Sequence, residues 1–175
     1  MSNPHKTLIH TALIYEARPL IQTLKLTQNT LLPKIYENDM YILVVSGIGK
    51  NNTTESLETL FKKQAFKRAV NIGIAGCKEE EIPIGTLFCT NQQLKTVPKA
   101  TITCVTEPLD AKSSLSSLLV DMESDAFLEV CTKYLPQNEC FVFKVVSDYC
   151  NSVIPKKSFV IDLIQKQIKT IKEFL

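Results

Sequence analysis

The stretch Ala-Val-Asn-Ile-Gly-Ile-Ala-Gly, residues 69–76, is a nearly continuous apolar run with glycines at positions 73 and 76. Such a run is typical of a strand buried on both faces, because a strand with one solvated face alternates apolar and polar residues. We therefore predict a buried strand over residues 69–75. Equally apolar runs predict further strands at residues 7–14, 40–46 and 140–147, with shorter candidates at 86–90 and 100–105.

Helical periodicity lies between these runs. A helix over residues 15–25 places Pro19 in its first turn, where proline is tolerated. After the tight loop at residues 47–50, Asn52 and Glu55 resemble the capping box of a second helix. Apolar stripes mark this helix, a third over residues 121–134 and a closing helix: Leu57, Leu60, Phe61 and Ala65; Met122, Ala126 and Val130; Phe159, Leu163, Ile164, Ile168, Ile171 and Leu175.

Buried strands that alternate with amphipathic helices predict an α/β fold. The pattern indicates three layers, αβα, around a central, mostly parallel sheet. With 175 residues the chain has the length of a single domain, which we place over residues 1–175.

The composition excludes several classes of function. A net charge of +2 without a basic stripe argues against a nucleic-acid polymer as partner. The apolar run at residues 8–14 is too short for a membrane span and has no cleavage site, so we expect a cytoplasmic protein. His5 and His10 have no partner pattern, which argues against a metal or triad role. The cysteines lack metal-ligand spacing and predict a reduced core without disulfides or metal: Cys77, Cys89, Cys104, Cys131, Cys140 and Cys150.

Polar and glycine residues gather where the predicted strands end. In sheets of this kind, ligands bind beyond the carboxyl ends of the strands. The candidate segments at strand ends are Tyr15-Glu16, Ser46-Gly-Ile-Gly49, Gly73-Ile-Ala-Gly76 and Ser147-Asp148, and Asp121-Met-Glu123 at a helix start is a fifth. The glycine loop lacks the spacer of a P-loop and the third glycine of a dinucleotide fingerprint, so we expect no nucleotide cofactor. These segments predict a site for a small, mostly neutral ligand.

The order of these segments resembles the purine nucleoside phosphorylase and methylthioadenosine/S-adenosylhomocysteine nucleosidase family. The resemblance spans about residues 8–151 and rests on six motifs in the family's order: Ala12-Leu-Ile-Tyr-Glu16, Val45-Ser-Gly-Ile-Gly-Lys50, Asn71-Ile-Gly-Ile-Ala-Gly76, Ile82-Pro-Ile-Gly-Thr86, Val120-Asp-Met-Glu123 and Val145-Val-Ser-Asp148. It implies the fold of that family, with a mixed sheet, and a purine nucleoside as ligand.

The resemblance also implies a role for each site residue. Asp148 is the acid that protonates the leaving purine, oriented by Ser147, and Glu16 activates water and stabilises the cationic sugar. Glu123 accepts hydrogen bonds from the ribose hydroxyls, and Met122 packs against the sugar. Ser46, Gly47, Ala75 and Gly76 complete the substrate-binding set. The implied substrate is a methylthioadenosine, S-adenosylhomocysteine or futalosine-type nucleoside, and the implied reaction is hydrolysis.

Other interpretations remain open at this point. Taken singly, Glu16 and Glu123 could be first-turn helix charges, and Asp148 a turn residue. Arg18 leaves a phosphorylase as an alternative, although a carboxylate at position 16 favours water. Residues 91–119 are fewer than in family members and include no stacking aromatic, since Phe88 precedes them and Phe127 follows Glu123. A trimmed relative that binds a nucleoside or a partner chain without efficient turnover is therefore a second alternative. The family commonly dimerises, and we expect a homodimer.

Overall fold

The computed structural model describes residues 6–107, 115–151 and 155–175. Its centre is four parallel strands in the order β4, β1, β5, β9. Their bounds are Thr7–Thr11 for β1, Tyr41–Val45 for β4, Arg68–Cys77 for β5 and Cys140–Asp148 for β9. All four follow the apolar runs of the sequence, because both faces of these strands are covered.

Short strands extend this centre on both sides and make the sheet mixed. On one side, β3 (Ile35–Glu37) runs antiparallel to β4, and β2 (Thr27–Gln28) runs antiparallel to β3. On the other side, β8 (Leu119–Asp121) pairs antiparallel with the end of β5 and carries the parallel strand β7 (Ile102–Cys104). The strand β6 (Leu87–Cys89) runs antiparallel to β9.

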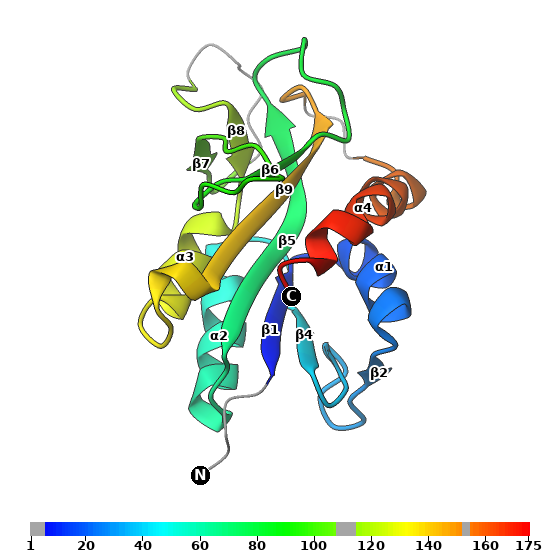
Figure 1. The fold of residues 1–175 in the computed structure, drawn as a ribbon, viewed down its shortest axis with the longest axis vertical. Coiled ribbons are helices and arrows are strands. Elements are labelled where there is room, and N and C mark those ends of the chain that lie inside the picture. The colour runs from blue at the N-terminus through cyan, green and yellow to red at the C-terminus, as the bar shows by residue number, and fades with distance from the viewer. Residues whose placement is uncertain (1–5, 108–114, 152–154) are drawn as a thin grey trace.

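Helices cover the two faces of the sheet (Figure 1). One face packs against α1 (Ile14–Leu24) and α4 (Lys157–Lys172) around a core that includes Leu20, Ile72 and Ile164. The opposite face packs against α2 (Lys50–Lys63) and α3 (Ser124–Cys131) around Leu57, Phe127 and other apolar side chains. A 3₁₀ turn over Gln137–Glu139 leads into β9. The predicted three-layer α/β class with a mixed sheet is confirmed.

Two predicted helix starts are wrong in detail. Because α1 begins at Ile14, Pro19 is its sixth residue and lies beyond the first turn. The helix α2 is capped by Gly49, so Asn52 forms no capping box with Glu55; its side-chain amide donates to the Ile48 carbonyl oxygen at 2.8 Å instead.

Three members of the predicted apolar stripes also lie elsewhere. The helix α2 ends at Lys63, which leaves Ala65 exposed beyond it and buries Phe66 in its place. Met122 precedes α3, and Phe159 is 38% exposed while Val160 faces the core.

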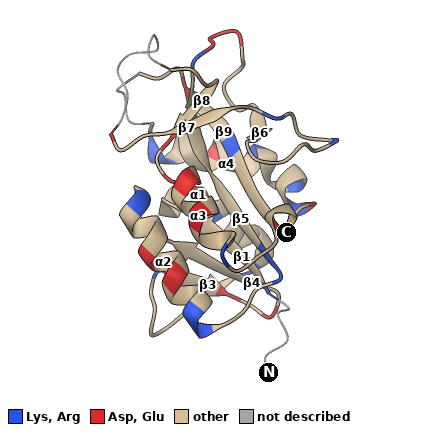
Figure 2. Ribbon diagram, turned by 90° about the vertical axis from the view of Figure 1, so that its left-hand side faces the viewer, with Lys and Arg blue, Asp and Glu red and all other residues tan. Residues whose placement is uncertain are grey.

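Charged residues of both signs occur along the described part of the chain. Figure 2 shows Lys and Arg interspersed with Asp and Glu over the ribbon. All six cysteines are free. In the part of the chain that the structure describes, no helix is long and apolar enough to cross a membrane. Across the same ranges, no group of three or more His, Cys, Asp or Glu is arranged to hold a metal ion.

Candidate functional site

A cavity of about 240 Å³ opens where β1, β5 and β9 end. This volume lies just below the usual range of about 300–1,000 Å³ for small-molecule sites, so the cavity suits one small ligand. Its wall comes from four stretches of chain and the residues near them: Ala12, Leu13 and Glu16; Ile74, Ala75 and Gly76; Val120, Asp121, Met122 and Glu123; Ser147, Asp148, Cys150 and Asn151; with Ile48, Val105 and Pro155.

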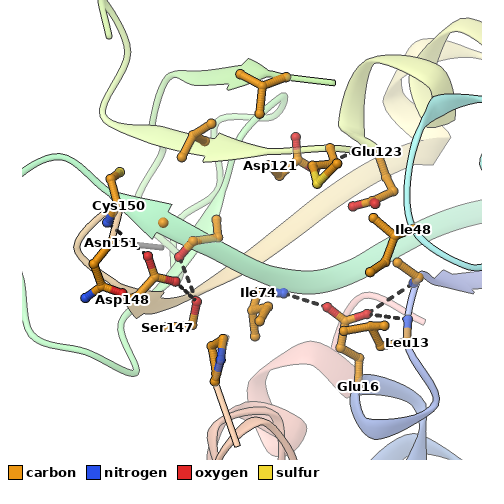
Figure 3. Close-up of a pocket in the computed structure, with 17 residues that line it drawn as sticks. Leu13, Glu16, Ile48, Ile74, Asp121, Glu123, Ser147, Asp148, Cys150 and Asn151 are labelled. Carbon is orange, nitrogen blue, oxygen red and sulfur yellow. Dashed lines mark hydrogen bonds between the residues drawn. The ribbon is translucent and has the colours of Figure 1, made fainter. Parts of the chain in front are cut away.

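Most of the predicted site residues line this one cavity: Glu16, Ala75, Gly76, Met122, Glu123, Ser147 and Asp148. Figure 3 shows Ser147 and Asp148 at one end of the cavity and Glu16 at the other, with Ile74 between them. Ser46 and Gly47, also predicted to bind substrate, do not line the cavity. From their loop it is Ile48 that reaches it.

Glu16 is the third residue of α1, and its carboxylate caps that helix from within. The first N–H groups of a helix have no partner inside it, and Leu13, at the cap position, has no side-chain acceptor. Glu16 Oε2 therefore accepts from the Leu13 N–H at 2.9 Å and the Ala12 N–H at 3.1 Å, and Oε1 accepts from the Ile74 N–H at 3.0 Å. With 3% exposure, Glu16 is no surface charge.

Burial changes the ionisation of Glu16. Loss of hydration raises the pKa of its carboxyl to about 7, while the Lys144 cation and the N–H groups of Ile74 and Leu13 act in the opposite direction. A carboxyl with a pKa near 7 exchanges its proton readily at neutral pH. This property is typical of a catalytic acid or base.

Glu123 lies just before α3 and is held by the glycine loop. Its Oε1 accepts from the Gly49 N–H at 2.7 Å, and the side chain is buried. Gly49 has φ of +95°, a conformation that favours glycine and turns its N–H toward the carboxylate. Burial raises the pKa of Glu123, and the Lys144 cation opposes that rise. The loop therefore positions Glu123 at the wall of the cavity.

Asp148 ends β9 at an irregularity of the sheet. The β5–β9 register shifts there, so that Ala75 pairs with Val146 but Gly76 pairs with Asp148. Such a bulge re-aims side chains at the end of a strand. The Ser147 hydroxyl donates to Asp148 Oδ2 at 2.6 Å, and the Cys150 N–H donates to Oδ1 at 2.9 Å. Both contacts fix the orientation of the Asp148 carboxyl.

Lys144 and Asp121 form a buried ion pair that the sequence analysis missed. Lys144 Nζ lies 2.7 Å from Asp121 Oδ2, and both side chains are almost fully buried. Burial disfavours the charge of Lys144, but Asp121, Glu123 and Glu16 together raise the lysine pKa. Burial also disfavours the charge of Asp121, but Lys144 and the hydrogen bonds from Ser124 and the Glu123 N–H together lower the pKa of Asp121. The available signal was a lysine inside the apolar run of residues 140–147.

His10 was also missed, and the structure gives it a positioning role. The Asn71 side-chain amide lies 2.7 Å from Nδ1, and Nε2 lies 2.8 Å from the Ser46 hydroxyl. That hydroxyl donates to the Gly47 carbonyl oxygen at 2.7 Å. Burial lowers the pKa of His10 to about 3, so the ring is neutral. The chain of contacts ties the glycine loop to β1 and β5, which explains why Ser46 is buried behind the cavity.

The wall contains no stacking aromatic among the described residues. Phe88 and Phe127 are both buried in the hydrophobic cores and do not line the cavity. Val105, Val120 and Cys150 provide apolar surface near Asp148. The segment 91–119 is described only in part, because residues 108–114 lie outside the described ranges.

Comparison with protein-family models gives no match, and comparison with curated proteins gives none either. Solved structures do match. A mutant methylthioadenosine nucleosidase of Helicobacter pylori, with 5′-methylthioadenosine in its active site, has a TM-score of 0.81 at 14% identity, covering 97% of each chain. A mutant futalosine hydrolase of the same organism has a TM-score of 0.81 at 15% identity, covering 97% of this chain and 98% of the other.

A third match comes from S. pneumoniae. Its 5′-methylthioadenosine/S-adenosylhomocysteine nucleosidase, solved with a transition-state inhibitor, has a TM-score of 0.79 at 19% identity and covers 97% of each chain. At these identities the likeness concerns the fold. The chain therefore has the fold of the nucleoside phosphorylase and nucleosidase family, as the order of its motifs predicted.

Proposed function

We propose that this chain is a purine nucleosidase that hydrolyses the N-glycosidic bond of a methylthioadenosine, S-adenosylhomocysteine or futalosine-type nucleoside. The observation that carries the proposal is that Glu16, Glu123 and Asp148 line a single cavity, each held by hydrogen bonds. The nucleosidase and hydrolase names of the matched structures support it.

The three carboxyl groups divide the reaction between them. As the bond from C1′ to the base nitrogen breaks, its electron pair leaves with the purine, and Asp148 gives that purine a proton. Glu16 takes a proton from the water that attacks C1′ and stabilises the positive charge on the sugar. Glu123 accepts hydrogen bonds from the ribose hydroxyls. The products are the free base and the free sugar.

Water is favoured over phosphate as the attacking group. Among the described residues no Lys or Arg lines the cavity, and Lys144 behind it is paired with Asp121. The backbone N–H groups of Leu13 and Ile74 at this wall already donate to Glu16. Arg18 is exposed and does not line the cavity. A bound phosphate would meet the carboxylate of Glu16 without a compensating cation.

Asp148→Asn tests the proposal. The amide keeps the shape of the side chain but cannot supply the proton, so base release should fall by about 10²–10⁴-fold with an unchanged melting temperature. The substrates are 5′-methylthioadenosine, S-adenosylhomocysteine and futalosine, with free base measured chromatographically. Asp162→Asn, at an exposed position of α4, is the matched control and should keep the wild-type rate. A wild-type rate in Asp148→Asn would remove Asp148 from the mechanism.

The same assay, run with and without phosphate, separates hydrolysis from phosphorolysis. We expect no acceleration by phosphate and free sugar as the only sugar product. Formation of a sugar 1-phosphate would assign the chain to phosphorolysis instead. Absence of base release from every substrate, with ligand binding retained, would identify a nucleoside-binding protein without turnover.

A further inference from the structure

Lys144 places an ammonium group behind the wall of the cavity, where the proposed reaction gives it no step. The residue is 1% exposed and lies in the middle of β9. A buried ion pair contributes little net stability, because apolar residues of similar volume often serve as well. Packing therefore gives no reason for a lysine at this position, and its surroundings must supply one.

Gly73 leaves an open path between Lys144 and Glu16. It pairs with Lys144 in the β5–β9 register. A Cβ atom on Gly73 would lie 2.9 Å from Glu16 Oε1 and 3.2 Å from Lys144 Nζ. The carboxylate and the ammonium thus approach the same point above the β5 backbone, with no side chain from Gly73 between them.

The titratable groups around Lys144 come from several elements of the fold. Asp121 at the end of β8 is the direct partner, Glu123 precedes α3, Glu16 belongs to α1, and the neutral ring of His10 projects from β1. One ammonium therefore serves three carboxyl groups. Its interaction with Asp121 reduces the positive potential that remains for Glu16 and Glu123.

We propose that Lys144 and Asp121 are a positioning pair for Glu16. The positive charge of Lys144 stabilises the ionised carboxylate of Glu16 at the wall of the cavity, and the negative charge of Asp121 limits that stabilisation. The effect of this pair on catalysis rests on the proposed hydrolysis, because Glu16 must be ionised to accept a proton from water. The pair itself touches neither the water nor the sugar in this scheme.

Opposite shifts follow for the two partners. Without the positive charge of Lys144, the carboxylate of Glu16 is less stable, so Glu16 should titrate at a higher pH than its wild-type pKa of about 7. Without the negative charge of Asp121, more of the Lys144 potential reaches Glu16, which should then titrate at a lower pH. If the pair had a purely structural role, removing either charge would not shift the titration of Glu16 in opposite directions.

The test is ¹³C NMR of the glutamate side-chain carboxyls in the free protein, with the Glu16 signal assigned through Glu16→Gln. Lys144→Met should raise the Glu16 midpoint by roughly one pH unit or more, and Asp121→Asn should lower it. Lys133→Met removes a half-exposed lysine that pairs with Glu58 at 3.7 Å, and should leave the midpoint unchanged. Equal midpoints in folded Lys144→Met and wild type would overturn the proposal.

Lys144→Met leaves Asp121 without its partner and risks misfolding. The double variant Lys144→Met/Asp121→Asn removes both charges and should also raise the midpoint; an unchanged value there would overturn the proposal equally. The pH profile of kcat/KM provides the second readout, since its acidic limb should move with the NMR midpoint. NMR shifts as expected without base release would support the pair and contradict the proposed hydrolysis, so the two failures are distinguishable.

Discussion

Glu123 is proposed to bind the ribose, so its substitution should affect the binding of a nucleoside and not the binding of the free base. It is held by the Gly49 N–H at 2.7 Å, and its remaining oxygen can accept from the ribose hydroxyls. Glu123→Gln should weaken binding of 5′-methylthioadenosine by about tenfold or more, because hydrogen bonds to a charged group contribute ~1.5–3 kcal/mol. Binding of adenine should change little.

Calorimetry with both ligands measures this difference. Glu129→Gln is the matched control, since Glu129 lies exposed on α3 and pairs with Lys50 only at the surface. It should leave both affinities unchanged. An equal loss for adenine and for the nucleoside would remove the ribose assignment from Glu123.

At the scale of the element, β5 can pass directly beneath the Glu16 carboxylate because Gly73 carries no side chain. A Cβ at 2.9 Å from Glu16 Oε1 is closer than such atoms approach one another, so Gly73→Ala must displace the Glu16 carboxylate. A displacement of ~1 Å can lower the rate by roughly 100-fold. We therefore expect a large fall in kcat/KM in the base-release assay.

Gly85→Ala provides the comparison for that variant. Gly85 has φ of +93°, and a Cβ there would meet Leu163 at an ordinary 3.6 Å, away from the cavity. The strain should lower the free energy of unfolding by roughly 1–2 kcal/mol without changing kcat/KM. If Gly73→Ala retained full activity, Glu16 would not need its present position for the reaction.

At the scale of the whole molecule, we propose a homodimer that covers the open side of the cavity. Ile48 lines the cavity and is nevertheless 51% exposed, and apolar surface at such a rim is often covered by another subunit. Light scattering at micromolar concentration should give twice the chain mass of 19.7 kDa. Ile48→Ser should shift the mass toward the monomer.

Met40→Ser is the control for that experiment. Met40 is 56% exposed but lies just before β4, at the opposite end of the strand from the glycine loop. It should leave the mass unchanged. A single species of 19.7 kDa for the wild-type chain would contradict the dimer.

The sequence by itself determined the central strands, the four helices around them and the order of the wall segments. These features depend on local periodicity: an apolar run at residues 69–75 can only be a buried segment, and the following motifs occur in the family's order. Glu16 and Asp148 were identified because each follows a predicted strand, Glu123 because it lies at a predicted helix start, and all three through their place in the family's motifs. The helix starts were less well predicted, since a backbone cap such as Gly49 leaves no side-chain signature.

The tertiary structure alone decided how the charges behind the cavity are paired. Lys144 meets Asp121 only because β9 lies parallel to β5 while β8 runs antiparallel along the end of β5. Ser46 turns toward His10 instead of the cavity for a similar reason, since its partner comes from a neighbouring strand. Contacts of this kind depend on register between distant segments, which local periodicity does not encode. The burial that raises the pKa of Glu16 arises in the same way.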